Sequence, residues 1–600
     1  MNKLDLFCQS ESMTRPGVVR KLKKTLSEQA NLQEKRIAVL GGSTTNEILN
    51  QLELYLLNCG IRPVFYESDY NMFFEEIMFD NPRLDEFKPD LVYIHSTTNN
   101  IKMAPSIDST DEEVDTILEN TYSQFETLWN SIEAKYGCAV IQNNFDPPPY
   151  RPLGNLDGTD RRGLTCFTRE LNFRFAKASR ERTGLIIHDI DRLASEIGLN
   201  NWHDPSSWYA YKCIPGLKAT PRLAKSLAGT IRALFGKASK CLVLDLDNTL
   251  WGGIIGDDGV EGIKLGRETA EASAYLAFQK YIKALKERGI ILAVCSKNEK
   301  ENAIKGLEHP DSALPPENFT IIRANWSPKS ENIAAIAQAI NIDADSLVFF
   351  DDNPAEREIV RQQIPETAVI EPTTEFASDV SAYIAALDRS GLFETVRISK
   401  EDLQRNEYYS ANADRAELQL QYTDYGDYLD SLQMTAEIGF FAPQYLERIT
   451  QLTNKTNQFN LTTIRYTLPE IQAATDDPNQ LDLYGRLTDK FGNNGLVSVI
   501  LGQQEGETLS ISLWLMSCRV FKREMELTMF DALVAEAGKR GIKKIIGTYA
   551  PTPKNGFVSD FYETLGFTLL EQRENGKTVW EFPVDDDYSN QNTHIKVEYA

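Results

Sequence analysis

The stretch Lys240–Gly253, KCLVLDLDNTLWGG, decides the fold of the central part of the chain. Its apolar half predicts a short buried strand, which delivers Asp245 and Asp247 to an abrupt polar turn. Parallel α/β sheets bind their ligands at such carboxyl ends of strands. Two carboxylates one residue apart can hold a divalent cation, and one of them can attack phosphorus. A lone DxD sequence is common, so the rest of the chain has to decide its meaning.

Three further motifs follow in order, each at a predicted strand end or helix start. A strand at Ile290–Val294 leads to Cys295-Ser296-Lys297-Asn298, and Lys329 stands at the start of a helix in ANWSPKSE. A strand at Leu347–Phe350 then leads into Asp351-Asp352-Asn353-Pro354. With DLDNTL, this series resembles the four motifs of the haloacid-dehalogenase (HAD) superfamily of phosphotransferases. We therefore predict a Rossmann-like HAD domain at residues 238–375.

The charges of these residues suit phosphoryl transfer, which needs a nucleophile, a cation and donors for the phosphoryl oxygens. Asp245 is predicted to attack phosphorus, and Asp247 to protonate the leaving oxygen and later activate water. Ser296 and Lys329 are predicted to hold the phosphoryl group. Oxygen ligands favour Mg²⁺. The predicted metal ligands are Asp245, Asp247, Asp351 and Asp352.

The segment between the first two motifs is too short for a cap domain. Asp245 and Ser296 are 51 positions apart, and a glycine-rich hairpin at Trp251–Gly266 and an amphipathic helix fill the space. A HAD core without a cap leaves its active site open. The substrate is then large, or a neighbouring domain acts as the lid.

The N-terminal part, residues 1–235, is predicted to be a first doubly wound α/β domain. Its strand Arg36–Leu40 ends in Gly41-Gly42-Ser43-Thr44-Thr45, and a helical pattern follows. Further strands are predicted after it, with helical segments between them. They lie at Arg62–Tyr66, Asp90–His95, Ala139–Asn143 and Gly184–Asp189.

This N-terminal domain has features similar to the SGNH hydrolases, which have a three-layer α/β fold. Ser43 stands in the nucleophile loop, Asn99 or Asn100 follows a central strand, and His203 comes late in the domain. The usual GDS is GGS here, and Asn200 stands where an aspartate would orient the imidazole. We expect a degenerate scaffold or docking domain, with an active esterase as the alternative.

The C-terminal part changes to short strands around one long helix at residues 431–600, after a helical connector at 376–430. The order of elements resembles the α+β fold of the GCN5-related N-acetyltransferases (GNAT). Arg519 and Lys522 occupy the loop that binds the CoA pyrophosphate in that fold, but both loop glycines are missing and Glu524 adds negative charge. Acetyl-CoA chemistry is therefore disfavoured, although the fold could still hold a pantetheine arm.

The order of the three parts resembles the FkbH-like proteins, also called the HAD-IIIC family. The resemblance is close over roughly residues 238–585 and looser before them. It rests on the sequence segments LDLDNTLWGG, SKN, PKSENI, FFDDNP, LTNKTNQFNLTT, MSCRVF and PTPKN. The resemblance implies transfer of a glyceryl unit from 1,3-bisphosphoglycerate to the phosphopantetheine thiol of an acyl carrier protein, as a thioester for polyketide-type biosynthesis.

A thioester forms only when a thiol attacks the carbonyl carbon, because attack by Asp245 on the acyl phosphate would release free glycerate. We therefore expect a thiol to capture the acyl group while the Asp245 site removes the phosphate at C3. The protein thiols considered are Cys295, whose pKa Lys297 would lower, and Cys518. Direct attack by the carrier's thiol needs neither. A plain HAD phosphatase and a non-catalytic assembly scaffold remain the alternatives.

The composition of the chain limits the classes of partner that it can bind. A net charge of −24 argues against nucleic acid and anionic membranes, and an acidic carrier protein would need a local basic patch. Residues 15–35 are basic and polar, with apolar positions at helical spacing. The eight cysteines have no metal-ligand spacing, and the sequence has neither a signal-peptide pattern nor a run of about 18 apolar residues. We expect a soluble, cytoplasmic enzyme.

Overall fold

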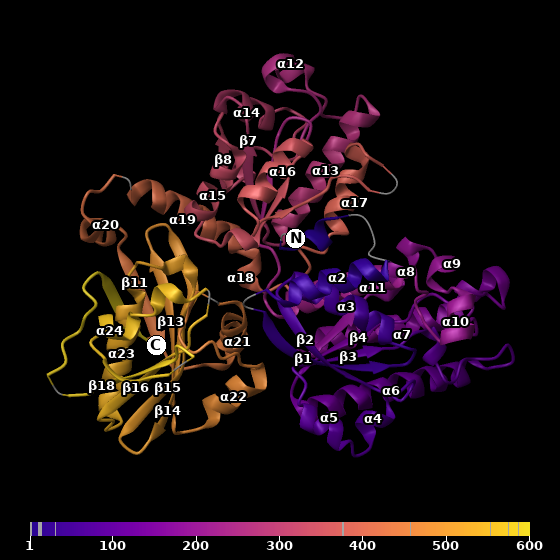
Figure 1. Cartoon of the computed structure of the whole chain (residues 1–600), viewed down its shortest axis with the longest axis horizontal. Helices are drawn as coiled ribbons and strands as arrows, with labels where there is room; N and C mark the ends of the chain where they lie inside the picture. Colours follow the sequence, from indigo (N-terminus) through magenta and orange to yellow (C-terminus); the bar gives the residue numbers. More distant parts are fainter. Residues whose placement is uncertain are drawn as a thin grey trace. The chain divides into compact units, whose positions relative to one another are not determined.

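The computed structural model describes residues 3–9, 15–29, 32–374, 377–419, 421–456, 458–552, 554–573, 575–585 and 587–600 (Figure 1). The chain divides into two compact units, each described by itself below. One unit is Leu4–Leu234, and the other combines Met1–Lys3 with Phe235–Ala600. Three sheets fall within the predicted ranges 1–235, 238–375 and 431–600, so the multidomain α/β architecture is confirmed.

A five-stranded parallel sheet forms the centre of the N-terminal unit, in the order β2-β1-β3-β4-β5. Apolar residues fill its strands because both faces are covered by helices. The strands are β1 (Gln33–Gly41), β2 (Ile61–Glu67), β3 (Leu91–His95), β4 (Ala139–Asn143) and β5 (Leu185–His188). All five predicted strands are therefore present.

Helices cover both faces of this sheet and give three layers. Aromatic residues of α6 (Asp111–Tyr136) and α7 (Leu164–Glu181) pack on one face with Ala38 and Leu40 of β1. On the other side, α3 (Asn46–Asn58) and α11 (Thr220–Leu234) belong to a second apolar cluster. The predicted three-layer α/β arrangement is confirmed for this unit.

The central sheet is also parallel and has the order β10-β9-β6-β7-β8. Its β6 (Cys241–Leu244) lies between two neighbours, so its carboxyl end faces the loops of both. The other strands are β7 (Ile291–Ser296), β8 (Ile321–Ala324), β9 (Leu347–Phe350) and β10 (Ala368–Val369). This order places the first, second and fourth HAD motifs side by side.

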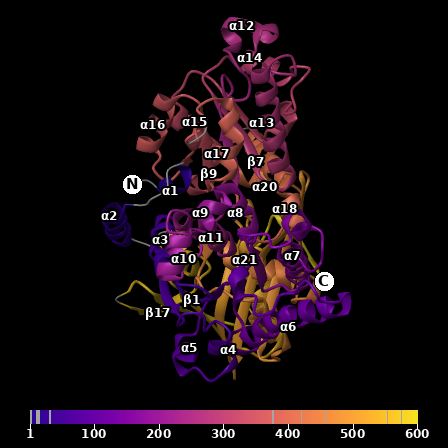
Figure 2. The same cartoon turned by 90° about the vertical axis from the view of Figure 1, so that its right-hand side faces the viewer.

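Helices on the two faces hold the central sheet. On one face, α15 (Lys329–Ala339) and α16 (Pro354–Gln363) pack on alternate residues of β6 and β7. On the other, Phe278 of α13 (Ala270–Glu287) packs on Phe350 with their rings 5.0 Å apart. Figure 2 shows α15 and α16 on the opposite side from α13.

The predicted hairpin at Trp251–Gly266 is only partly correct. Gly252 and Lys264 pair as a single antiparallel bridge, but the tip between them is the helical segment α12 (Ile255–Gly262), broken at Gly259. The Asp258 side chain stabilises the start of this segment, because it accepts a 2.8 Å hydrogen bond from the amide of Ile254. The segment is still too small to be a cap domain.

The predicted helical connector is present as α17 (Tyr383–Asp388), α18 (Lys400–Leu403), α19 (Arg405–Gln419) and α20 (Tyr425–Ser431). A mixed sheet follows, in the order β17-β18-β16-β15-β14-β13-β11-β19, and β12 (Phe459–Asn460) pairs with β15. One face of the sheet carries α23 (Met525–Lys539), and the other carries α21 (Leu446–Lys455) and α22 (Leu468–Asp476). The α+β class of this part is confirmed.

The strands of this third sheet are β11 (Met434–Gly439), β13 (Gln480–Asp489), β14 (Gly492–Glu505), β15 (Thr508–Met516), β16 (Lys544–Tyr549), β17 (Thr568–Gln572), β18 (Thr578–Pro583) and β19 (Ile595–Tyr599). No helix in the described ranges is both long enough and apolar enough to cross a bilayer.

Candidate active site

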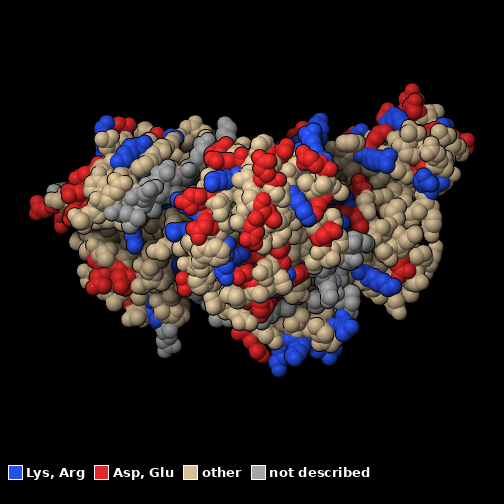
Figure 3. Space-filling model, turned by 90° about the horizontal axis from the view of Figure 1, so that it is seen from above, with Lys and Arg blue, Asp and Glu red and all other residues tan. Residues whose placement is uncertain are grey.

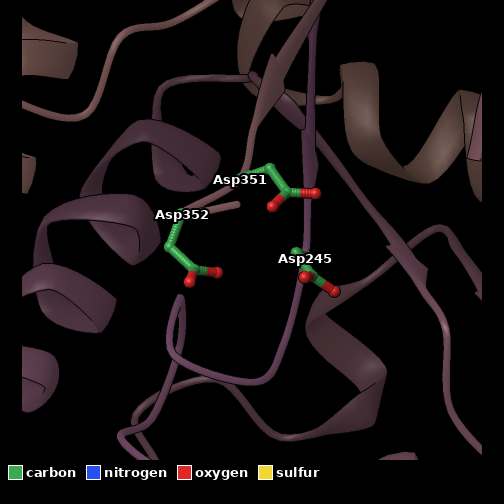
Figure 4. A group of neighbouring side chains, drawn as sticks. All are labelled: Asp245, Asp351 and Asp352. Atoms are coloured by element: carbon green, nitrogen blue, oxygen red, sulfur yellow. The ribbon is translucent and has the colours of Figure 1, made fainter. Parts of the chain in front are cut away.

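Three carboxylates converge at the carboxyl edge of the central sheet (Figure 4). Asp245 follows β6, and Asp351 and Asp352 follow the neighbouring strand β9. Each offers one oxygen, and these three oxygens lie within 4.8 Å of one another. Because β6 and β9 are hydrogen-bonded neighbours, residues far apart in the sequence meet at one point.

Lys329 bridges two of these acids from the first turn of α15. Its Nζ lies 2.7 Å from Oδ2 of Asp245 and 2.5 Å from Oδ2 of Asp351. The lysine side chain is only 3% exposed, so its charge is held in place within the site. Lys329 therefore holds a buried positive charge between Asp245 and Asp351, and its role toward a phosphoryl group stays a prediction.

The site carries more negative charge than its lysine balances. Three carboxylates face one ammonium, and Oδ1 of Asp245 is buried without a hydrogen-bond partner. An unpartnered buried carboxylate oxygen is costly, and a divalent cation bound by oxygen ligands would satisfy it. The residues present therefore fit Mg²⁺, with Asp245, Asp351 and Asp352 as its protein ligands.

The pKa values respond to this crowding. Burial, and then the charge of Asp245, raise the pKa of Asp351, although Lys329 opposes the shift. The same two causes raise the pKa of Asp352. Burial lowers the pKa of Lys329, but the charges of Asp245 and Asp351 outweigh it and leave the pKa raised. Like charges gathered in a shielded site produce this pattern, and a bound cation would relieve it.

Asp247 lies beside this cluster, and its oxygens are not among the three that converge. Its place among the metal ligands stays a prediction. Its Oδ1 accepts hydrogen bonds from Nε1 of Trp251 (2.9 Å) and from the amide of Ile255 (3.0 Å). Its Oδ2 accepts one from Nδ2 of Asn298 (3.1 Å). Burial raises the pKa of Asp247 despite these donors, which suits a group that holds and releases a proton.

Sequence reasoning missed the residues that orient these acids. Asn298 and Trp251 orient Asp247 by hydrogen bonds, and both residues lie within the sequence motifs themselves. Thr249 ties the first loop to the fourth through a 3.2 Å hydrogen bond to Asp352. Arg357 of α16 donates to the carbonyl groups of Asp351 (2.9 Å) and Asp352 (2.7 Å). Only the tertiary structure shows these links.

Ser296 is the last residue of β7 and is 2% exposed, at the same edge of the sheet as Asp245. The next residue, Lys297, pairs with Glu356 at 2.6 Å. Lys297 is therefore engaged by α16, and it does not act on Cys295 as the sequence analysis expected.

Cys295 is not an activated thiol. The residue is fully buried among the apolar side chains under α15, and burial raises the pKa of its thiol to about 12. A thiol with so high a pKa is protonated at neutral pH and is a poor nucleophile. Cys518 is only partly buried, in a short 3₁₀ turn after β15, and stays a candidate.

The N-terminal candidates do not assemble into a catalytic triad. Ser43 donates a 3.2 Å hydrogen bond to the carbonyl of Ile214, and within the described residues no hydrogen bond joins it to His203. Asn99 is exposed, whereas its neighbour Asn100 donates to the carbonyl of Gly42 at 2.8 Å. Ser43 and Asn100 therefore hold the loops together by bonds to backbone carbonyls.

His203 finds an aspartate elsewhere in the chain. Its Nε2 lies 3.1 Å from Oδ2 of Asp146 and 2.8 Å from the carbonyl of Pro147. Burial alone would lower the pKa of His203, but the bond to Asp146 and its charge raise it. Asp146 also accepts from Nε1 of Trp202 (2.8 Å) and the amide of Thr98 (2.7 Å). Asp146 and His203 are therefore both held by hydrogen bonds within the protein, as in a pair that stabilises the fold.

The two arginines of the C-terminal loop are engaged within the protein, whereas the side chain of Lys522 is exposed. The guanidinium of Arg519 stacks over Tyr408 at 4.6 Å, and Arg523 donates to Asp489 at 3.2 Å. The carbonyl of Lys522 accepts a hydrogen bond from the hydroxyl of Tyr425. Because Tyr408 and Tyr425 belong to α19 and α20, the helical connector covers the loop in which a CoA phosphate was considered.

The gap beside this loop is also filled. Strands β15 and β16 pair only at Thr508–Ser510 and then diverge. Leu461 bridges them, because its amide donates to the carbonyl of Trp514 (3.0 Å) and its carbonyl accepts from the amide of Ala550 (2.7 Å). A pantetheine arm between these strands would have to displace the chain's own backbone.

Comparison with known proteins supports the resemblance to FkbH-like proteins. Residues 36–232 match the family described as FkbH, N-terminal domain. The N-terminal part of the protein BF1531 from Bacteroides fragilis, which contains a phosphatase domain complexed with Mg, is a similar solved structure. It shares 29% identity with a TM-score of 0.58, covering 63% of this chain and 99% of that one. The resemblance predicted from the sequence is thus confirmed.

Two acetyltransferase structures are similar at low scores. The ribosomal-protein-S18-alanine N-acetyltransferase from Escherichia coli is 12% identical, with a TM-score of 0.21, over 26% of this chain and all of that one. The GNAT-family acetyltransferase from Streptococcus pneumoniae is 14% identical, with the same score, over 25% and 99%. Scores this low carry no argument about activity. No curated protein sequence matches the chain.

Proposed function

We propose that this chain is a Mg²⁺-dependent HAD-type phosphatase of the FkbH kind that acts in glyceryl transfer to an acyl carrier protein. The observation that carries the phosphatase core is the converging set of Asp245, Asp351 and Asp352, with Lys329 between two of them and Oδ1 of Asp245 unsatisfied. The similar BF1531 structure, which contains Mg and a phosphatase domain, supports the same reading.

In the first step, a carboxylate oxygen of Asp245 attacks phosphorus. The bond from phosphorus to the leaving oxygen breaks, and the proton of Asp247 passes to that oxygen. Lys329 keeps Asp245 oriented and balances part of the phosphoryl charge. When bound by Asp245, Asp351 and Asp352, Mg²⁺ supplies charge neutralisation for the phosphoryl oxygens.

In the second step, Asp247 takes a proton from water, and the water oxygen attacks the phosphoryl group on Asp245. The bond between Asp245 and phosphorus breaks, and inorganic phosphate is released. The donors on Asp247, Trp251 and Asn298, keep its carboxylate aimed through both steps. The enzyme returns to its starting state without any other reactant.

For glyceryl transfer, the thiol of the carrier's phosphopantetheine attacks the C1 carbonyl of 1,3-bisphosphoglycerate. A carbon–sulfur bond forms, phosphate leaves, and the thiol proton is lost to solvent. The Asp245 site then hydrolyses the C3 phosphate. Direct attack is favoured here because Cys295 is buried and protonated. This division of labour keeps the acyl phosphate from being wasted.

Intact-protein mass spectrometry tests this proposal. The enzyme is incubated with Mg²⁺, 1,3-bisphosphoglycerate and a holo carrier protein, and both proteins are weighed. We expect a glyceryl mass on the carrier with the wild-type chain, and a phosphoglyceryl mass with Asp245→Asn. Cys518→Ala is expected to leave the result unchanged. Release of only glycerate and phosphate would refute transfer, and an adduct on Cys518 would refute direct attack.

A plain phosphatase is the second candidate, since the structure offers a phosphate site but a covered loop at Arg519 and a filled gap at Leu461. Phosphate release from a generic phosphomonoester without any carrier would favour it, provided that carrier addition changes neither the rate nor the product. Should Asp245→Asn leave function intact in the cell, a non-catalytic scaffold would be the better description.

A further inference from the structure

One helix of this acidic protein carries a concentrated positive charge. In Arg15–Ser27, which contains α2 (Pro16–Ser27), there are five Lys and Arg residues and no Asp or Glu, although the whole chain has a net charge of −24. Elsewhere acidic and basic side chains are interspersed, as the face in Figure 3 shows. The phosphate chemistry proposed above makes no use of this helix.

The helix is fixed to its own unit by one face. Val19 and Leu26 are buried, and Lys23 is directed inward, where it pairs with Glu53 and donates to Oδ1 of Asn50 at 2.9 Å. Both partners belong to α3. Lys23 therefore anchors α2 to α3, and the other four cations of the helix do not take part in this contact.

The other four cations face outward. Arg15, Arg20, Lys21 and Lys24 are exposed, and in the described parts of the chain no ion pair joins any of them to an acid. Lys24 is four residues after Arg20 and three after Lys21, which places the three cations on one side of the helix. Arg62 of the edge strand β2 adds a further exposed cation, since its guanidinium donates to the carbonyl of Ser27 at 2.8 Å.

The surroundings of these cations favour an acidic protein as the partner. A helix that lies in a membrane surface turns large apolar side chains outward. Here Val18 is the one exposed large apolar residue of α2, while Val19 and Leu26 are buried against the protein. Nucleic acid is disfavoured because the rest of the chain would repel it. A compact protein with an acidic helix needs only a local basic patch.

We propose that α2, with Arg62 beside its end, is the docking surface for the acidic acyl carrier protein. This proposal rests on the proposed function, which requires such a partner. Docking through exposed cations raises the association rate and depends on salt, and it needs no change in the phosphate site.

Charge reversal tests the docking surface. A variant with Arg15→Glu, Arg20→Glu, Lys21→Glu and Lys24→Glu is compared with the wild-type chain in binding to a holo acyl carrier protein at low and at roughly 0.2 M salt. The matched control reverses four exposed cations on other helices. These are Lys177, Arg180, Lys280 and Lys283.

We expect the α2 variant to bind the carrier at least about tenfold more weakly at low salt and to lose the salt dependence, while the control variant stays within about twofold of wild type. Equal weakening in both variants, or none in the α2 variant, would overturn the proposal. Competition by phosphatidylglycerol vesicles or by a second copy of the chain, without carrier binding, would overturn it as well.

Phosphate release from an alkyl phosphomonoester separates this proposal from the proposed function. We expect the α2 variant to keep the wild-type rate with this small substrate, which shows an intact site. Carrier binding through α2 without any glyceryl mass would refute the transfer function and leave docking standing. Glyceryl transfer that the α2 variant performs at the wild-type carrier concentration dependence would refute docking alone.

Discussion

The two parallel sheets of this protein place polar side chains at the same topological position with opposite results. At the edge of the central sheet, Asp245, Asp351 and Asp352 crowd together with one lysine and leave a buried oxygen unsatisfied. At the edge of the N-terminal sheet, Asp146 accepts hydrogen bonds from Trp202 and Thr98, and His203 lies beside it. A strand end rich in polar residues is therefore not by itself an active site.

Electrostatic balance separates the two edges. A cluster whose hydrogen bonds are complete stabilises the fold, and removal of one partner costs free energy. A cluster with excess like charge is destabilised until a ligand binds, which is the usual condition of a catalytic site. The comparison predicts that equivalent substitutions at the two edges differ in kind, and four experiments can break or sharpen it.

The largest difference is expected in activity. Asp245→Asn should lower Mg²⁺-dependent phosphate release by about 1000-fold or more, because an amide neither attacks phosphorus nor balances a cation. Ser43→Ala should stay within about twofold of wild type. The measurement is phosphate release from an alkyl phosphomonoester. A loss in Ser43→Ala as large as that in Asp245→Asn would mean that the N-terminal edge is catalytic after all.

The second difference is in stability, measured by urea unfolding without divalent cations. Asp146→Asn should lower the free energy of unfolding by about 3 kcal/mol, because it removes the charge that pairs with His203 and replaces one of the two acceptor oxygens by an amide donor. Asp352→Asn should raise it by up to about 1 kcal/mol by relieving repulsion from Asp245.

Addition of Mg²⁺ should reverse the order of stability of the wild-type chain and Asp352→Asn. The wild-type chain gains stability by ligand binding, and Asp352→Asn gains less because it has lost a ligand charge. Asp146→Asn should gain as much as wild type. If Mg²⁺ stabilises wild type and Asp352→Asn equally, Asp352 is not a ligand.

The third difference concerns the leaving group. Asn298→Ala should slow phosphate release from an alkyl phosphomonoester about tenfold more than from acetyl phosphate, because an alkoxide leaves only when Asp247 protonates it and a carboxylate leaves unaided. Trp251→Phe should act in the same direction. Asn318→Ala, whose side chain bonds Lys286, is the control. An equal effect on both substrates would reduce Asn298 to a structural role.

The smallest effect is a pH dependence at the N-terminal edge. The folded-state pKa of His203 is raised, so its stabilisation is complete below the unfolded pKa of about 6.5 and is lost as pH rises through the folded pKa. The folded-state pKa of Asp146 is lowered: burial alone would raise it, but the bond to His203 and its charge outweigh burial. Its contribution is lost only as pH falls through that lowered pKa.

The difference in unfolding free energy between wild type and His203→Gln should therefore be larger at pH 5.5 than at pH 8.5. The same comparison with Asn99→Gln, an exposed residue of the same unit that does not titrate, should show no such change. A difference that grows toward pH 8.5 would show that His203 is held neutral in the folded protein.

Much of the central domain was predictable because its information is local. A run of apolar residues that ends in DLDNTL, and another that ends in Asp351-Asp352, is visible in the sequence and predicts strands with acids at their ends. The lysine at the start of α15 and the short distance between motifs were also visible. The three-layer N-terminal fold followed from the same alternation of strand and helix.

The errors arose where long-range contacts decide. Lys297 was expected to act on its neighbour Cys295, but it pairs with Glu356 of α16, and the thiol lies under α15 with a raised pKa. The contact that orients Asp247 was not foreseen either, because Asn298, which donates to its carboxylate, is 51 positions away in the sequence. No spacing rule contains such contacts.

The sequence by itself determined the order of the strands' polar ends, the HAD motifs and the absence of room for a cap, since these depend on residue type and spacing. Tertiary structure alone decided which polar groups are satisfied. Asp146, which no motif marked, completes the partners of His203, while Asp245 keeps an oxygen without one. The reason is physical: hydrogen bonding and burial depend on neighbours that the fold brings from distant parts of the chain.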